Sequence, residues 1–485
     1  MLRRSTVMTW VRRGLLGLLA TQIAVVATLV GIDHWRKKVR PHRVNFPRTE
    51  PTSLPLGGNT TTVYTYGADL FEDMLGAIRG ARRRVLFESF IIKSDAVGRE
   101  FKAALIEAAE RGVEVYVVYD GFANLVVPRR FFEFPPSVRV LRYPVFRLGM
   151  LLLDVRKSGR DHRKILTVDG EIGFVGGFNI GSTYAMEWRD THLRVAGPVV
   201  WELENAFVDF WNSNKAASDP ELEGLGETEW DPHIRVHRNV PEQLIYPIRA
   251  MFLEALDRAK DRVLFTQAYF IPDQELANVL VEAAGRGVDV NVLVPENSNH
   301  VVADWLARGR YSELLRGGVR LWLYQGTMVH AKTATVDGQW STIGTANVDR
   351  LSLIGNYEIN VELFDEGVAK HLERVFDVDL TNARELPEEE WRGRPVMAKF
   401  SEIVLAPWRS FLCGLSGPPS SCEIGAGKSR HGTRFRGSLA QGHAVPGEVN
   451  PRGRTGGTCG GRTPPAPHDV AAVHPSAVAP DGDPC

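Results

Sequence analysis

The chain has 485 residues, of which 44% are hydrophobic, so it can bury cores for two or three globular domains. Its 58 Lys and Arg residues balance its 58 Asp and Glu residues, which argues against the basic field typical of nucleic-acid-binding proteins. The four cysteines all lie after residue 412, at Cys413, Cys422, Cys459 and Cys485. This position excludes a disulfide framework or a cysteine metal site in the body of the protein.

An uncharged run near the N-terminus, residues 14–32, predicts a membrane helix within an anchor region of residues 1–45. As a helix, its 19 residues would span roughly 28 Å, close to the hydrocarbon core of about 30 Å. A cleaved signal peptide is the alternative, but the run is longer than a usual signal core and no small-residue cleavage site follows it. Five basic residues follow the run and four precede it, so the positive-inside rule narrowly favours a cytoplasmic body.

The body of the chain is predicted to be a duplicated α/β unit. A buried strand at 85–92, a helix at 98–111 and a strand at 113–120 come first. The same order returns as a strand near Val263, a helix at about 273–286 and a strand from Val288. LIEAAERGVEVYVV matches LVEAAGRGVDVNVL at an offset of 175 residues. This alternation predicts an α/β fold with a mixed sheet in each half.

A second match is the motif HRKILTVDGEIGFVGGFN, which aligns with HAKTATVDGQWSTIGTAN at an offset of 168 residues. The equivalent pairs are His162 and His330, Lys164 and Lys332, Asp169 and Asp337, Gly176 and Gly344, Asn179 and Asn347, and Asp190 and Glu358. We predict a first repeat at 61–225 and a second at 226–412. Such repeats pack about a pseudo-twofold axis, so the two half-sites should form one cleft. The Gly- and Pro-rich residues 413–485 are predicted to be a disordered tail.

The paired His-x-Lys motifs fit phosphodiester chemistry. Residues two apart on a strand point the same way, so two imidazoles and two ammonium groups would enter the shared cleft. A phosphodiester needs positive donors on its nonbridging oxygens, a nucleophile and an acid for the leaving alkoxide. One histidine can form a phosphohistidine while the other acts as acid and base. Lys164, Lys332, Asn179 and Asn347 would hold the phosphoryl oxygens.

Acidic residues recur at equivalent positions of both repeats. A carboxylate on the second ring nitrogen would fix the tautomer of a nucleophilic histidine, and Asp190 and Glu358, each 28 residues after a histidine, suit that role. Asp169 and Asp337 complete the motif among the candidate catalytic residues, but each precedes a glycine, so a turn carboxylate that bonds local backbone is the favoured reading. Gly176, Gly177 and Gly344 either let backbone approach the phosphate or form a tight turn.

Two further histidines and two apolar segments also have plain structural explanations. His192 is expected to be structural, and His300 is an even candidate for lining the cleft. No acidic or histidine cluster has metal-ligand spacing, so we predict metal independence and no cofactor. Two apolar segments, RRFFEFPP from Arg129 and VFRLGMLLLDV from Val145, either meet lipid or pack in the core.

The duplicated His-x-Lys-x4-Asp motif resembles the signature of the phospholipase D superfamily over about residues 61–379. RDHRKILTVDG, EWRDTHLRVAGP, HAKTATVDG and NYEINVELFD make the chain most similar to bacterial cardiolipin synthases. The resemblance implies that two phosphatidylglycerol molecules are joined into cardiolipin with release of glycerol, through a phosphatidyl-histidine, at the bacterial inner membrane. It also implies, by analogy with the stricter Gly-Gly-x-Asn loop of the first half, His162 as nucleophile and His330 as acid and base.

The chain departs from the family pattern at a few places. Thr345 stands where the family commonly has Ser, and Asp-Arg-Leu-Ser at 349–352 stands where it often has Asp-x-Arg-Ser. One N-terminal membrane helix is predicted where many relatives carry two. The rival functions are a hydrolytic phospholipase D, transfer to another alcohol such as serine, a nuclease, and a noncatalytic scaffold. Balanced charge and the anchor argue against a nuclease, and the intact histidines and lysines argue against a scaffold.

Overall fold

The computed structural model describes residues 45–146, 159–224, 226, 231–299, 301–396, 399 and 404, with scattered residues between 12 and 31. Most of the predicted anchor and the whole of the predicted tail lie outside these residues. Within the described part of the chain, no helix combines the length and the apolar character needed to cross a bilayer.

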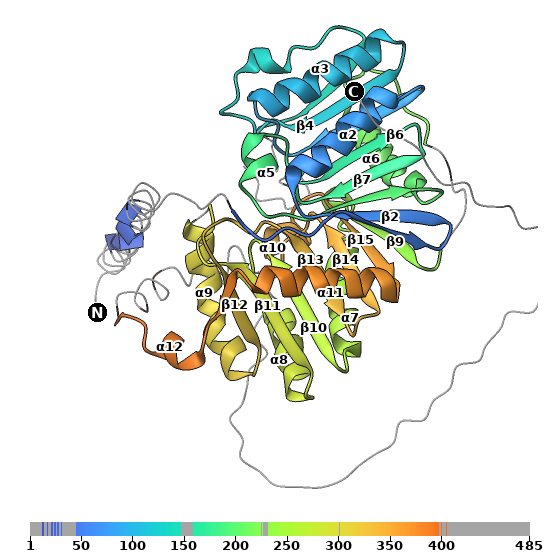
Figure 1. Cartoon of the computed structure of the whole chain (residues 1–485). Helices are drawn as coiled ribbons and strands as arrows, with labels where there is room; N and C mark the ends of the chain where they lie inside the picture. Colours follow the sequence, from blue (N-terminus) through green and yellow to red (C-terminus); the bar gives the residue numbers. More distant parts are fainter. Residues whose placement is uncertain are drawn as a thin grey trace, which may run out of the picture. The chain divides into compact units, whose positions relative to one another are not determined.

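The first half is built on an eight-stranded sheet with the order β1-β2-β8-β7-β6-β3-β4-β5 (Figure 1). Its strands are β1 (Thr52–Leu56), β2 (Asn59–Tyr64), β3 (Arg84–Ser89), β4 (Glu114–Asp120), β5 (Val138–Tyr143), β6 (Lys164–Val168), β7 (Ile172–Gly176) and β8 (His192–Ala196). β3, β4 and β5 pair in parallel, and the remaining neighbours pair antiparallel. The prediction of a mixed sheet is therefore confirmed.

The second half repeats this topology in the order β16-β12-β11-β10-β13-β14-β15-β9. Its strands are β9 (Ile234–Asn239), β10 (Arg262–Gln267), β11 (Asp289–Pro295), β12 (Arg320–Tyr324), β13 (Lys332–Val336), β14 (Trp340–Gly344), β15 (Glu358–Phe364) and β16 (Ala383–Glu385). Read from β9 to β12, the order matches that from β2 to β5. β1 is an edge strand without an equivalent in the second sheet, and β16 is an edge strand without an equivalent in the first.

Helices cover both faces of each sheet (Figure 1). In the first half, α2, α3 and α5 cover one face of the sheet, and α6 covers the other. In the second half, α7, α8, α9 and α10 cover one face, and α11 covers the other. Their bounds are α2 (Gly67–Gly80), α3 (Ala96–Glu110), α5 (Ser182–Met186), α6 (Val200–Asn214), α7 (Pro247–Arg258), α8 (Gln274–Gly285), α9 (Val301–Arg316), α10 (Arg350–Ile354), α11 (Glu366–Leu380) and α12 (Glu388–Arg392), with 3₁₀ turns η1 (Arg129–Phe132) and η3 (Pro241–Gln243).

Matched local signals start and stop the equivalent helices α3 and α8. Asp95 and Asp273 cap them by accepting hydrogen bonds from the amides of Gly98 and Leu276. Gly112 and Gly287 follow them with φ of 91° and 94°, a left-handed conformation that favours glycine after a helix. The strand, helix and strand predicted in each half are confirmed, with boundaries that differ by a few residues.

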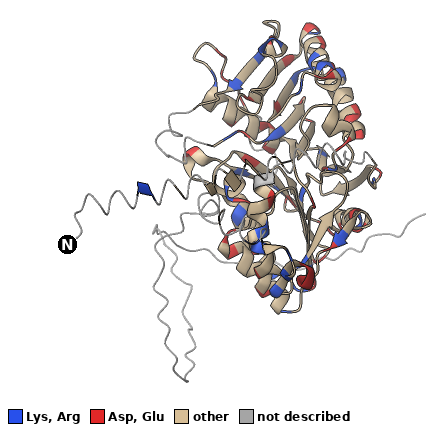
Figure 2. Ribbon diagram, turned by 90° about the vertical axis from the view of Figure 1, so that its left-hand side faces the viewer, with Lys and Arg blue, Asp and Glu red and all other residues tan. Residues whose placement is uncertain are grey.

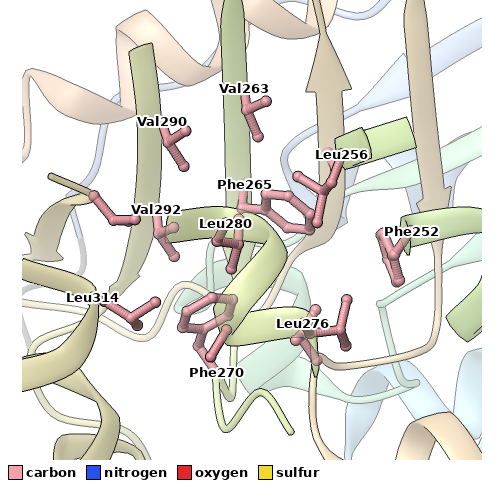
Figure 3. Packing of buried hydrophobic residues seen from close by; sticks show 14 of the residues in the cluster. Phe252, Leu256, Val263, Phe265, Phe270, Leu276, Leu280, Val290, Val292 and Leu314 are labelled. Carbon is pink, nitrogen blue, oxygen red and sulfur yellow. The ribbon is translucent and has the colours of Figure 1, made fainter. Parts of the chain in front are cut away.

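Each half has its own apolar core. In the second half, side chains of α7, α8 and α9 pack onto alternate residues of β10 and β11, such as Val263 and Phe265 (Figure 3). The segment RRFFEFPP packs similarly in the first half, where the Phe132 ring stacks on Tyr119 with 4.0 Å between centroids. The phenylalanines of that segment therefore pack on the core. The other apolar segment lies outside the described residues from position 147 to 158.

The two halves meet through backbone pairs that obey a pseudo-twofold relation. Asp161 bridges to Tyr357, and Arg189 bridges to Val329. These contacts are equivalent, because an offset of 168 residues converts 161 into 329 and 189 into 357. Apolar residues of both halves, including Val175 and Ile343, also share one buried cluster. The histidine motif of each half is therefore attached to the acidic segment of the opposite half.

Candidate active site

The His-x-Lys motifs enter the structure just before β6 and β13. Lys164 and Lys332 are the first residues of these strands, and each histidine lies two positions earlier. The amide of His162 donates to the carbonyl of Tyr357 at 3.1 Å, and the amide of His330 donates to the carbonyl of Arg189 at 2.6 Å. Both catalytic candidates are thereby fixed at the boundary between the halves.

Each imidazole is held by a carboxylate of the opposite half. Nδ1 of His162 lies 2.9 Å from Oε2 of Glu358, and Nδ1 of His330 lies 2.6 Å from Oδ2 of Asp190. Each carboxylate follows the histidine of its own repeat by 28 residues, but the structure pairs it with the histidine of the other repeat. A carboxylate at Nδ1 places the proton there and leaves Nε2 with a free lone pair.

Further groups fix the two carboxylates. The hydroxyl of Thr345 donates to Oε2 of Glu358 at 2.5 Å, so the threonine that departs from the family pattern supplies the hydroxyl that holds this acid. In the first half the equivalent position is Gly177, where a Cβ would lie 2.0 Å from Oδ1 of Asp190. Glycine is needed there because the carboxylate itself occupies the space.

Arg189 connects Asp190 to the second half. Its guanidinium is buried and binds Asp379 through two hydrogen bonds, Nε to Oδ1 at 2.9 Å and Nη2 to Oδ2 at 2.8 Å. Its Nη1 also donates to the carbonyl of Asp190 and to the hydroxyl of Thr191. Sequence reasoning missed this pair, because residues 189 and 379 show no motif or spacing that connects them.

The two lysines are buried beside the histidines. Nζ of Lys164 donates to the carbonyl of His162 at 2.6 Å, and Nζ of Lys332 donates to the carbonyl of His330. Desolvation lowers the pKa of Lys164 to about 8 and that of Lys332 to about 7, against the attraction of nearby carboxylates. Both cations are therefore close to losing their charge near neutral pH.

Burial also keeps the imidazoles neutral. Desolvation lowers the pKa of His162, and it lowers the pKa of His330 to about 3, with Lys332 adding repulsion. Desolvation opposes the charge of Asp190, but His330 and Lys332 outweigh it and hold its pKa below the usual value. A neutral imidazole beside an ionised carboxylate is the state that a histidine nucleophile requires.

A cavity of about 280 Å³ opens over both histidines. Asn179 and Asn347, which are expected to hold phosphoryl oxygens, line it, whereas Lys164 and Lys332, which were expected to enter it, are not among its lining residues. Oδ1 of Asn179 accepts from the amide of Ile91 at 3.1 Å, whereas Oδ1 of Asn347 is buried and has no hydrogen-bond partner among the described residues. The remaining lining residues are Phe90, Ile91, Tyr184, Trp188, Tyr269, Ile271, Asn299, Ala303, Leu306, Asp349, Leu351, Ser352 and Asn356.

Aromatic rings cover the outer sides of the imidazoles. Phe90 meets His162 edge to face with centroids 4.7 Å apart, and Trp188 lies 5.2 Å from His330. Asp349 also lines the cavity, where desolvation raises the pKa of its carboxyl to about 7 while its Oδ1 caps α10. The Asn-x-Asp spacing after the second motif was the available sequence signal for Asp349.

Asp169 and Asp337 lie away from the histidines, at the far ends of β6 and β13. They occupy Asp-Gly hairpin turns with φ of 56° and 53°. The carboxylate of Asp169 accepts from the amides of Arg82, Arg83 and Arg84, which lie at and just before the start of β3 rather than in the local turn. Asp337 makes equivalent bonds to residues 260–262. These contacts give both aspartates a structural role, and neither is among the residues that line the cavity described above.

Two further histidines were weaker candidates. His192 is buried on β8 and does not line the cavity. His300 lies outside the described residues, although its neighbour Asn299 is part of the cavity wall. Among the residues that the structure describes, no three His, Cys, Asp or Glu side chains are grouped to hold a metal ion.

Comparison with known proteins gives consistent matches. The family described as "Cardiolipin synthase, PLD-like domain" matches residues 74–211 and 252–380. Cardiolipin synthase 2 of Staphylococcus epidermidis is 32% identical over 354 residues, which cover 71% of this chain and 72% of that protein. Cardiolipin synthase of Staphylococcus aureus is 31% identical over 364 residues, with the same coverage. The crystal structure of phosphatidylserine synthase from Haemophilus influenzae has a TM-score of 0.56 at 13% identity, over 76% of this chain and 95% of that chain, which shows a shared fold.

We expect Asp169→Asn to lower stability without disabling the site. Asparagine tolerates the left-handed turn but removes the charge that three amides bind, which should cost about 1–3 kcal/mol in the free energy of unfolding. Those amides overcome desolvation and hold the pKa of Asp169 below its usual value, so its contribution is present at neutral pH and is lost on acidification. Urea unfolding and kcat/KM are measured together. A large loss of kcat at unchanged stability would contradict the structural assignment.

We also expect kcat/KM to fall as pH rises through about 7 to 8. The pKa of Lys332 is lowered to about 7 and that of Lys164 to about 8, so both lose the positive charge on this alkaline side. Lys332→Arg keeps its charge at these pH values and should flatten part of the decline, at a lower maximal rate. A flat wild-type profile between pH 6 and 9 would show that neither lysine titrates in this range.

Proposed function

Because the chain belongs to the family of phospholipase D-like cardiolipin synthases, we propose that it joins two phosphatidylglycerol molecules into cardiolipin and releases glycerol. It is a phosphatidyltransferase of the phospholipase D type. One observation carries the proposal for the site: two imidazoles, each held at Nδ1 by a carboxylate of the opposite half, face a single cavity. Such a pair can divide one phosphoryl transfer into two displacements.

In the first displacement, Nε2 of His162 attacks the phosphorus of one phosphatidylglycerol. The bond from phosphorus to the glycerol headgroup oxygen breaks, and that oxygen leaves with a proton from His330. Glu358 stabilises the positive charge that develops on His162. Lys164, Lys332, Asn179 and Asn347 bind the nonbridging oxygens, which concentrate negative charge in the transition state.

In the second displacement, a headgroup hydroxyl of another phosphatidylglycerol attacks the phosphatidyl-histidine. His330 removes the hydroxyl proton, the bond between phosphorus and Nε2 breaks, and His162 is regenerated. Asp190 holds His330 in the required tautomer throughout. The bound anionic phosphodiester favours the protonated form of His330, so its low pKa in the free site does not prevent it from serving as the acid.

Membrane attachment belongs to the same proposal. The substrate and product remain in a bilayer, and residues 14–32 provide an uncharged run long enough to hold the enzyme there. The slight excess of basic residues after this run supports a body on the cytoplasmic side. We assign the enzyme to the bacterial inner membrane on this basis.

The lipid products test the proposed function. Purified full-length enzyme is incubated with phosphatidylglycerol in mixed micelles, and the lipids are analysed by mass spectrometry. We expect cardiolipin and glycerol in equal amounts, with loss of at least about a thousandfold in His162→Ala and in His330→Ala. Asp169→Asn serves as a control that leaves both histidines intact. Phosphatidic acid without cardiolipin would identify a hydrolase, and the absence of lipid turnover would reject both lipid activities.

The roles of the two histidines are tested with a substrate that needs no acid. A phosphatidyl ester of p-nitrophenol has a leaving group that departs unprotonated, so His330→Ala should still form the phosphatidyl-histidine. The variant should release about one equivalent of nitrophenolate in a burst and then stall, because the base for the second displacement is missing. Intact-mass analysis should detect the adduct, and peptide mapping should place it on His162. A burst in His162→Ala instead would reverse the assignment.

A further inference from the structure

The loop that follows β4 exposes large apolar side chains beside the active site. The exposed fractions are 48% for Phe122, 56% for Leu125 and 81% for Val126. Side chains of this size are usually buried, and three of them within five residues form a concentrated apolar tip. The loop differs from the segment RRFFEFPP that follows it, which packs on the core.

Hydrogen bonds keep this tip in a fixed conformation. Oδ1 of Asp120 accepts from the amides of Phe122 and Ala123 at 2.8 and 2.9 Å. Asn124, which is buried, donates to the carbonyls of Asp120 and Phe90, both at 2.8 Å. These bonds turn the polar groups of the loop inward and leave the apolar side chains outward.

The same bonds connect the tip to the catalytic cavity. Asn124 binds the backbone on both sides of Ile91, through the carbonyl of Phe90 and the amide of Ile92. Phe90 and Ile91 line the cavity, and the Phe90 ring contacts His162. A single residue, Asn124, therefore connects the exposed tip to the wall of the active site. On the second half, Leu351 lines the same cavity and is 52% exposed.

The charge of this region indicates which kind of surface the apolar tip can bind. Lys, Arg, Asp and Glu positions are interspersed over the two halves in the view of Figure 2, in line with the zero net charge of the chain. Residues 121–146 depart from this balance, with four arginines and one glutamate. Arg129 and Arg130 are both exposed directly after the tip. Apolar side chains flanked by cations complement an anionic lipid surface.

We propose that Phe122, Leu125 and Val126 insert into the anionic leaflet that holds the substrate, with Arg129 and Arg130 at the level of the headgroups. This docking sets the cavity against the membrane surface, so a phosphatidylglycerol headgroup enters it while its acyl chains stay among the lipids. The inference deepens the proposed function and rests on a phospholipid substrate. It adds a second membrane contact, separate from the predicted anchor.

Site-specific fluorescence tests the insertion without using activity. In the full-length enzyme with its four cysteines replaced by Ser, Val126→Cys carries an environment-sensitive NBD label, and Lys260→Cys is the control. Lys260 is exposed in the loop that binds Asp337, at the end of the second half away from the histidines. With phosphatidylglycerol vesicles, the label at 126 should shift to shorter wavelength and be quenched by nitroxide lipids, while the label at 260 should do neither. A label at 126 that stays in water on membrane-bound enzyme overturns the proposal.

A kinetic comparison separates this result from the proposed function. Leu125→Ser with Val126→Ser should lower turnover of long-chain phosphatidylglycerol in vesicles by at least about tenfold. Turnover of a short-chain phosphatidylglycerol dissolved as monomers should stay within about twofold of wild type, because the cavity is unchanged. Leu125→Met with Val126→Leu keeps the tip apolar and should retain vesicle activity. Equal losses on both substrates would overturn docking, whereas wild-type enzyme that makes no cardiolipin would reject the function and leave the fluorescence result to stand.

Discussion

The hydrogen bond between each histidine and the carboxylate of the opposite half is the interaction on which the site depends. Neither repeat contains a complete catalytic group, because His162 needs Glu358 and His330 needs Asp190. The backbone bridges beside the histidines also connect one half to the other. Arg189 adds a further contact between the halves, a buried bidentate pair with Asp379. Catalytic geometry and the packing of the two halves are therefore a single constraint.

Burial gives these groups their chemical character. In water the imidazoles would titrate near neutral pH and the lysines would stay charged well above it. In the site, desolvation disfavours the cationic forms of all four, which leaves neutral imidazoles and lysines whose pKa values lie near neutrality. The carboxylates prevent the lysines from losing their charge altogether. An arriving phosphodiester adds negative charge, so substrate binding itself favours the protonated lysines that bind it.

The sequence predicted the duplicated mixed sheets, because strand periodicity and a constant offset between repeats are local signals. Of the residues that it singled out, the motif histidines and asparagines line the cavity, whereas the lysines do not. It could not predict which carboxylate serves which histidine. Asp190 and Glu358 are equidistant from their own histidines, and only the packing of the halves brings each to the opposite one. Asp169 shows a second limit. The glycine after it favoured a turn carboxylate that bonds local backbone, but its carboxylate binds backbone at the start of β3, far away in the sequence.

Pseudo-symmetry places equivalent residues together, but the two halves have diverged around the cavity. Gly177 makes room for Asp190, whereas its equivalent Thr345 donates to Glu358. After β4 the chain forms the exposed apolar tip, whereas after β11 it forms α9, whose Leu306 lines the cavity. Two identical halves would give both histidines the same surroundings, yet a transfer through a covalent intermediate requires one to bond phosphorus and the other to move protons. The departures from symmetry lie in the residues that surround each histidine, where they can assign these two roles to different halves of one duplicated fold.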